Sequence, residues 1–283
     1  MEFNYLPTCS CTGNKLSCVD GKTWMKNMVG IWSFAYEKRD IRDKKVHPAT
    51  YPIQLATRII EQFTHRGELV LDPFCGSGTT LVAAQDMDRN CLGIDLKQEY
   101  VDLANRRIDN SLFCDSKQVA VCDDAHHTEK YITQKMVKLV CTSPPYADML
   151  NIQRKNKSRR SDQRKNEQYG VVEQYSQDDR DLGTMSVDIF CCQLTEIFTG
   201  IKKIMLDNGH VIINITDLWK DGHRIPLHIH VINAMEEAGF EYKNTIIWDK
   251  RNLVNGVGIF GYPSNFITLS ATFEYILDFV LKK

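Results

Sequence analysis

The feature that most constrains the fold is a regular alternation of short apolar runs with amphipathic segments, which begins near residue 47. A short apolar run bounded by turn residues is typical of a buried strand, whereas apolar residues spaced three and four apart indicate a helix. Strands that alternate with helices form a parallel sheet covered by helices on both faces. The expected strands are 68–72, 91–95, 118–123, 138–142, 210–216, 242–248 and 273–281.

No helical pattern separates the last two expected strands, so we expect them to pair as an antiparallel hairpin. The sequence therefore predicts an α/β fold with a mostly parallel, seven-stranded sheet. Residues 1–46 lack this regularity and are expected to form an N-terminal arm, followed by one domain over 47–283. The expected helices are 53–63, 76–87 after an initial turn, 98–108, one from 190 that stops at 207–209, and 226–240.

The composition is that of an ordinary globular protein in a reducing compartment. Of the 283 residues 43% are hydrophobic and 25% are charged, with a net charge of −1, a balance typical of soluble domains. No apolar stretch is long enough to span a membrane, and the N-terminus lacks the pattern of a signal peptide. We expect a cytoplasmic protein that meets no membrane; the sequence does not reveal the oligomeric state.

Ten cysteines invite a search for disulfides or metal. Most lie in or beside apolar runs, where a thiol behaves as a small core residue. Cys9, Cys11 and Cys18 form a loose cluster near the N-terminus. Three thiols without an evident fourth ligand are a weak argument for zinc, so we expect free thiols and no bound metal.

The segment DPFCGSGTT, residues 72–80, follows the first expected strand and opens a helix. Gly76 and Gly78 allow a tight turn and the close approach of a ligand. The segment is not a dinucleotide fingerprint, because Leu81 stands where a third glycine would be needed, and no P-loop lysine follows. Such a loop suits an adenosine cofactor with an amino-acid tail.

Acidic residues end the next two strands. Asp95 closes the second strand, where a carboxylate can accept both hydroxyls of a ribose. Asp123 and Asp124 follow the third strand, within reach of an adenine edge. Each acid alone could be a helix cap, but acids at three successive strand ends favour a binding site.

The segment TSPPY, residues 142–146, ends the fourth strand abruptly. Neither proline can donate to a sheet ladder, and the residue before a proline is driven toward extended geometry. Ser143 and Tyr146 are therefore expected on a stiff turn at the carboxyl end of a buried strand.

DPFCGSGTT together with TSPPY resembles the amino-methylating DNA methyltransferases, which transfer a methyl group from S-adenosylmethionine (SAM) to an exocyclic nitrogen of cytosine or adenine. The resemblance extends from HPATYP, residues 47–52, to the C-terminus and implies the Rossmann-like SAM-dependent methyltransferase fold. The resemblance and the strand-end residues together give the candidate cofactor-binding residues, which are Tyr51, Asp72, Phe74, Gly76, Gly78, Thr79, Thr80, Asp95, Asp123 and Asp124.

The resemblance makes Ser143, Pro144, Pro145 and Tyr146 the candidate catalytic residues. An exocyclic amine is a poor nucleophile because its lone pair is delocalised into the ring. Acceptors at its two N–H groups, the Ser143 hydroxyl and the Pro144 carbonyl, would draw the nitrogen toward tetrahedral geometry. Tyr146 would offer a face on which a flipped base can stack.

A basic run follows the TSPPY turn. Residues 154–165 carry seven basic residues and one acid, a local charge of +6, within a loop expected at about 150–184. Such runs are usually solvated loops, but this position favours a phosphate clamp on DNA. We expect the loop to be mobile without DNA. The candidate DNA contacts are Arg154, Lys155, Lys157, Arg159, Arg160, Arg164 and Lys165.

Two departures from the resembling enzymes leave alternatives open. The cofactor motif precedes the catalytic motif, an order commoner among adenine enzymes, and no separate recognition domain is evident. Serine before the two prolines favours cytosine, so we expect a cytosine-N4 DNA methyltransferase, in a restriction-modification setting or as an orphan enzyme of a prokaryote or phage. The alternatives are adenine-N6 methylation, methylation of RNA or of a protein glutamine, and an inactive protein that binds SAM and DNA.

Overall fold

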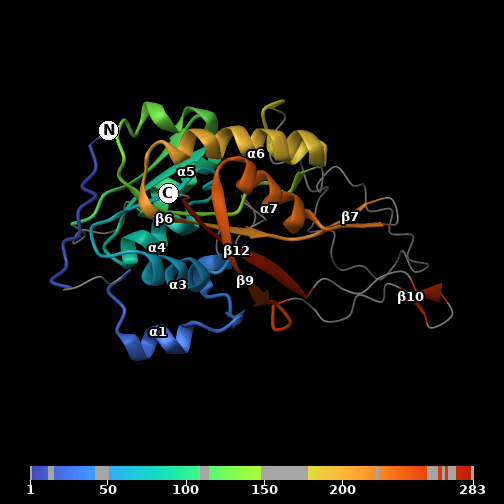
Figure 1. The fold of residues 1–283 in the computed structure, drawn as a ribbon, viewed down its shortest axis with the longest axis horizontal. Coiled ribbons are helices and arrows are strands. Elements are labelled where there is room, and N and C mark those ends of the chain that lie inside the picture. Colours follow the sequence, from blue (N-terminus) through green and yellow to red (C-terminus); the bar gives the residue numbers. More distant parts are fainter. Residues whose placement is uncertain are drawn as a thin grey trace.

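A computed structural model of the chain shows a layered α/β fold, with a central sheet between two sets of helices (Figure 1). The central sheet has eight strands in the order β1-β9-β12-β6-β5-β2-β3-β4. The prediction of a mostly parallel, Rossmann-like sheet with helices on both faces is confirmed. The structure describes residues 2–11, 16–41, 51–108, 115–147, 178–220, 223–253, 261–262, 265–266 and 272–281.

Only β12 runs against its neighbours, pairing antiparallel with β6 and β9, as predicted for the C-terminal hairpin. The remaining pairs of the sheet are parallel. The strands of the central sheet are β1 (Ile31–Ser33), β2 (Leu69–Asp72), β3 (Asn90–Asp95), β4 (Gln118–Cys122), β5 (Val137–Thr142), β6 (Met205–Ile215), β9 (Phe240–Asp249) and β12 (Phe273–Leu281). Two small hairpins consist of β7 (Leu218–Lys220) with β8 (His223–Ile225), and of β10 (Gly261–Tyr262) with β11 (Asn265–Phe266).

Each face of the sheet carries its own apolar core, because parallel strands are apolar on both sides. One core joins the sheet to α3 (Ile53–Phe63), α4 (Thr79–Asp86) and α5 (Gln98–Ile108). The other joins it to the 3₁₀ helix η1 (Ala125–Lys130), α6 (Val187–Lys202) and α7 (Leu227–Glu237). Figure 1 shows α6 and α7 on one side of the sheet and α3 and α4 on the other. The shorter helices are α1 (Gly21–Asn27), α2 (Lys38–Ile41) and η4 (Leu182–Thr184).

Two details differ from the sequence-based expectations. The arm, residues 1–46, is not separate from the sheet, since β1 adds an eighth strand beside β9. A strand of three residues is too short to show the alternation of apolar and polar residues by which a strand is recognised in a sequence. The helix expected to reach residue 207 ends at Lys202. Residues 207–209 lie inside β6, where Asn208 takes a left-handed conformation with φ 58° and the register against β5 shifts.

No helix in the described part of the chain is long and apolar enough to cross a membrane. The carboxyl ends of the parallel strands share one edge of the sheet, where ligands bind in open α/β folds. The turns after β2, β3, β4 and β5 all open onto this edge, which also receives the carboxyl end of β6 and the start of β12.

Candidate functional site

A pocket at the carboxyl edge of the sheet brings together most of the residues singled out in the sequence. It extends from the glycine loop after β2 to the proline turn after β5. Asp72, Gly78 and Thr80 are not among its lining residues; they lie behind the loop. The lining residues that the sequence predicted are Tyr51, Phe74, Gly76, Thr79, Asp95, Asp123, Asp124, Ser143, Pro144, Pro145 and Tyr146.

Asp72 is buried between the glycine loop after β2 and the proline turn after β5, and it connects the two by hydrogen bonds. Its carboxylate accepts hydrogen bonds from the hydroxyls of Thr80 at 2.5 Å and Thr142 at 2.6 Å, and from the backbone N–H of Phe74 at 3.2 Å. Burial raises its pKa to about 6, against the effect of these hydrogen bonds. Asp72 thus ties the start of α4 and the end of β5 to β2, which fixes the glycine loop relative to the proline turn.

The two glycines of the loop serve different purposes. Gly78 has a φ of +79°, and a Cβ atom there would lie 2.7 Å from the Cβ of Ala104 in α5. A glycine is therefore required at position 78 because α4 packs closely against α5. Gly76 has a φ of 47° and lines the pocket, so its backbone faces any bound ligand.

Asp95 holds the glycine loop while keeping acceptor capacity. One carboxylate oxygen accepts the N–H of Gly76 at 2.8 Å, and the other accepts the N–H of Lys97 at 2.9 Å. Each carboxylate oxygen can accept a second hydrogen bond. Burial, together with the negative charges of Asp72 and Asp181, raises the pKa of Asp95 to about 6, so the group titrates just below neutral pH.

The acids after β4 are more heavily engaged with the protein. Asp123 accepts hydrogen bonds from His127 at 2.7 Å, Tyr131 at 2.8 Å and Lys130 at 3.2 Å. Partial burial would raise its pKa, but these hydrogen bonds and that of the next backbone N–H hold it well below the usual range. Asp124 caps η1 through the backbone N–H of His126 at 2.9 Å. Both acids line the pocket, but much of the hydrogen-bonding capacity of Asp123 is used within the protein, and one oxygen of Asp124 is taken by His126.

The proline turn orients Ser143 as an acceptor. The Ser143 hydroxyl donates to the backbone carbonyl of Asn214 at 3.1 Å and lies 3.0 Å from the hydroxyl of Tyr146. Once its proton points at that carbonyl, the oxygen lone pairs are left to accept. The carbonyl of Pro145 accepts from Ala147 at 3.0 Å. Among the described residues no hydrogen bond reaches the carbonyl of Pro144, which also lines the pocket.

A polar network behind Ser143 was not anticipated. Glu274, which is 8% exposed, accepts from the amide of Asn214 at 2.6 Å and from Tyr146 at 3.3 Å, and it pairs with Lys250. The side-chain carbonyl oxygen of Asn214 is buried and has no hydrogen-bond partner among the residues that the structure describes. An unpaired buried acceptor at a site is costly unless a ligand satisfies it.

Asn214 lies in β6 and Glu274 in β12, while Lys250 directly follows β9. Tyr36 and Trp248 also line the pocket. The sequence carried a faint signal for two of the network residues. Asn214 interrupts the apolar run IINI, and Glu274 stands between Phe273 and Tyr275 in another apolar strand. A polar residue in a buried strand requires a partner or a function.

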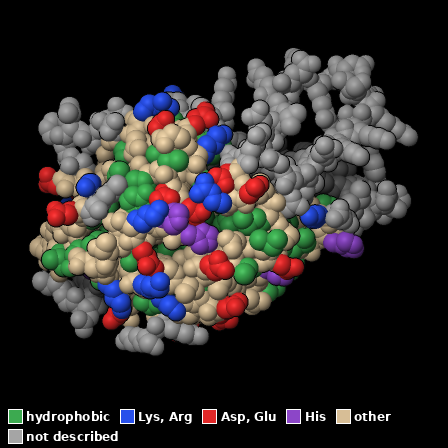
Figure 2. Space-filling view, turned by 90° about the horizontal axis from the view of Figure 1, so that it is seen from above, with side chains coloured by type: hydrophobic (Ala, Val, Ile, Leu, Met, Phe, Trp, Pro, Cys, Tyr) green, Lys and Arg blue, Asp and Glu red, His purple; other side chains and the backbone are tan. Residues whose placement is uncertain are grey.

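The predicted DNA contacts of the basic run, residues 154–165, lie outside the described residues, and of the loop predicted at about 150–184 the structure describes only residues 178–184. Figure 2 shows the molecule from above with basic and acidic side chains interspersed. Among the side chains that the structure describes, neither charge gathers on one part of this face. The basic loop remains the strongest sequence signal for a nucleic-acid partner.

Comparisons with known proteins find similarity over part of the chain. Residues 12–106, which include the glycine loop, match the N6_N4_Mtase family model, described as DNA methylase. The type II methyltransferase M.BglI of Bacillus subtilis is 33% identical over 115 residues, which cover 41% of this chain and 31% of that protein. M2.DpnII of Streptococcus pneumoniae, also a type II methyltransferase, is 38% identical over 84 residues, 30% of this chain and 31% of its own length.

The chain thus spans less than a third of the length of these two curated relatives. Among solved structures, TrmN from Thermus thermophilus superposes with a TM-score of 0.49 at 13% identity, covering 86% of this chain and 53% of that one.

Proposed function

We propose that the chain is a SAM-dependent DNA methyltransferase that methylates the exocyclic N4 of cytosine. The match of residues 12–106 to the DNA methylase model and the names of the curated relatives support the reaction class. The observation that carries the proposal is one pocket that joins a ribose acceptor, Asp95, to a hydroxyl set as an acceptor, Ser143.

The cofactor half of the pocket fits SAM by the chemistry of its groups. Each carboxylate oxygen of Asp95 already accepts one backbone N–H and has room for one ribose hydroxyl. Gly76 brings backbone without a side chain to the wall, and Phe74 adds a half-buried ring. SAM would supply an electrophilic methyl group bound to a sulfonium.

The acceptor half would prepare the amine for attack. Ser143 Oγ and the carbonyl of Pro144 would each accept one of the two N–H groups of the base. This withdraws the nitrogen from conjugation and leaves its lone pair directed at the methyl group. Because the hydroxyl proton of Ser143 is held by the carbonyl of Asn214, the acceptor is in position before the base arrives.

The transfer balances without a covalent enzyme intermediate. The amine nitrogen forms a bond to the methyl carbon as the carbon–sulfur bond breaks, and the bonding pair returns to sulfur. The extra proton then leaves the nitrogen for water. The cysteines of the pocket region need not act as nucleophiles, and burial raises the pKa of Cys75 and Cys141 well above the usual range.

The choice of cytosine rests on the serine at position 143. Adenine is the alternative, because its amine also presents two N–H groups and the geometry of the turn serves either base. RNA as the substrate and an inactive SAM- and DNA-binding protein are lesser alternatives. The basic run at 154–165 would hold the phosphates, and the base would be flipped out or single-stranded.

The deciding experiment incubates the purified chain with unmethylated DNA and methyl-labelled SAM, then separates the nucleosides by chromatography with mass detection. N4-methylcytosine is expected, and Ser143→Ala should abolish most of it. N6-methyladenine as the sole product would replace the cytosine assignment with adenine. DNA without label would overturn the proposal, and a parallel incubation with RNA would show whether RNA is the substrate instead.

A further inference from the structure

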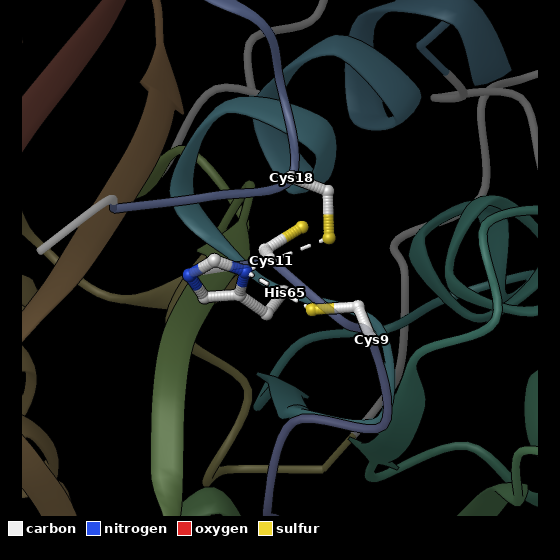
Figure 3. A group of neighbouring side chains, drawn as sticks. All are labelled: Cys9, Cys11, Cys18 and His65. Atoms are coloured by element: carbon white, nitrogen blue, oxygen red, sulfur yellow. Dashed lines mark hydrogen bonds between the residues drawn. The ribbon is translucent and has the colours of Figure 1, made fainter. Parts of the chain in front are cut away.

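The arm contributes to a second candidate site, which lies at the opposite end of β2 from the pocket. Cys9, Cys11 and Cys18 gather around the imidazole of His65, which lies in the turn between α3 and β2 (Figure 3). The four potential ligand atoms all lie within 4.8 Å of one another. The sequence offered three thiols without a fourth ligand; the fold supplies one from 47 residues beyond Cys18.

The two sulfur–nitrogen distances that involve His65 match an edge of a zinc tetrahedron. His65 Nδ1 lies 3.4 Å from the sulfur of Cys9 and 3.5 Å from that of Cys18. Zinc bonds of about 2.3 Å to sulfur and about 2.05 Å to nitrogen, at tetrahedral angles, put sulfur and nitrogen about 3.5 Å apart. We infer that Cys9, Cys11, Cys18 and His65 form a zinc site of the Cys₃His type.

The surroundings hold the ligands in place before any metal binds. The backbone N–H of Thr8 donates to the carbonyl of Arg66 at 2.8 Å, which fixes the cysteine segment beside the turn. The N–H of Arg66 points at the sulfur of Cys18 at 3.4 Å. Glu68 accepts from the N–H of His65 at 2.6 Å and shapes the turn itself. Hydrogen bonds of this kind orient ligands and tune a metal site.

The site is structural, because four protein ligands leave no open coordination position. It lies where the arm meets the start of β2, at the amino edge of the sheet and away from the pocket. Beyond Cys18 the arm forms α1 and β1, and its next residues bring Tyr36 to the pocket wall. Zinc would therefore anchor the arm whose far end completes the pocket.

Zinc content and cobalt spectroscopy test the site without reference to methylation. The full chain, reduced and loaded with zinc and then desalted, is expected to hold one zinc per chain by elemental mass spectrometry. Cobalt(II) should give the intense visible bands of tetrahedral thiolate coordination. Cys18→Ser should lose most of the zinc, and His65→Gln should shift the cobalt bands.

The matched controls are Cys192→Ser and His223→Gln, two exposed residues outside the cluster; both should retain zinc and the cobalt spectrum. The inference is overturned if the wild-type chain holds no more zinc than Cys18→Ser, or if its cobalt spectrum is that of an octahedral ion. It is also overturned if intact-mass analysis of the protein, before reduction, shows a disulfide among the three cysteines in place of metal. The wild-type measurements stand even if a variant fails to fold.

Discussion

The two halves of the pocket are built in different ways. The cofactor half comes from the turns after β2, β3 and β4, and its key carboxylate, Asp95, is bound by N–H groups of neighbouring loops. The acceptor half joins the proline turn to side chains of β6, β9 and β12. Tyr146 and Glu274, which are hydrogen-bonded there, lie 128 residues apart in the chain.

Because of this difference, the choice of substrate is easier to change in the acceptor half than in the cofactor half. Loops held by backbone N–H groups offer a fixed geometry for a ligand that never changes. A side-chain network centred on Glu274 and Asn214 can be altered by single substitutions without disturbing the glycine loop. The two halves meet at Asp72, whose carboxylate binds Thr80 of one half and Thr142 of the other.

The largest effect is expected from Glu274→Ala. The change removes the largely buried carboxylate that pairs with Lys250 and accepts from the amide of Asn214; that amide keeps only its hydrogen bond to Tyr146. Removing one member of a buried pair costs about 3–5 kcal/mol; since Lys250 is partly exposed, we expect a loss of about 3 kcal/mol in the free energy of unfolding. Urea denaturation measures it.

The matched control for that loss is Glu241→Ala, which removes another Glu–Lys pair of the same sheet, with Lys243, at an exposed position. Exposed pairs contribute about 0.2–1 kcal/mol. Equal losses in the free energy of unfolding would show that the network behind Ser143 stabilises the fold no more than an exposed ion pair does.

The next largest effect, on turnover, is expected from Ser143→Ala. Removing one preorganised group that acts in the transition state costs about 10²-fold or more, and SAM affinity should be unchanged because the side chain belongs to the acceptor half. Single-turnover transfer and calorimetry measure the two quantities. The exposed Ser33→Ala serves as the control. If Ser143→Ala lost SAM affinity in parallel with turnover, Ser143 would also belong to the cofactor half, and the proposed division of the pocket would be wrong.

For the cofactor half, the sequence predicted where most of the residues lie, while their part in binding a cofactor stays a prediction. Its residues follow strands of strong apolar character, so the position of each one at the carboxyl edge could be deduced from the alternation of elements. Even there, the roles of Asp72 and Gly78 differ from the expectation. A motif specifies which residues a loop requires, but not which of them face the ligand and which support the fold.

The sequence pointed to the proline turn and to the three clustered cysteines, but not to the polar network behind Ser143 or to His65, because these depend on tertiary contacts. Glu274 and Asn214 meet only because β12 inserts between β6 and β9. His65 joins the cysteines only because the arm passes the turn before β2. Neither contact produces a recognisable spacing of residues in the sequence. The short β1 likewise pairs with β9 across more than 200 residues of sequence.

A third prediction concerns Asp95→Ala. Losing the carboxylate leaves the ribose hydroxyls unpaired and frees the N–H groups of Gly76 and Lys97. Leaving buried groups unsatisfied costs about 1–3 kcal/mol, so SAM should bind more weakly by that amount in calorimetry. Glu99→Ala, an exposed acid one turn away, is the control. Wild-type affinity in Asp95→Ala would remove this residue from the cofactor site.

The smallest effect is the pH dependence of SAM binding, which tests the same carboxylate without deleting it. Burial raises the pKa of Asp95 to about 6, and only the ionised form accepts from two hydroxyls while also holding both N–H groups. As the pH falls from 7 to 5, the protonated fraction grows and SAM affinity should fall by up to about tenfold, since one pH unit below the pKa corresponds to about 1.4 kcal/mol. Asp95→Asn does not titrate, so its weaker affinity should be flat over this range. The buried Asp72, whose pKa is also raised to about 6, remains in that variant. A pH dependence that persists in Asp95→Asn would therefore assign the titration to Asp72 and not to the ribose acceptor.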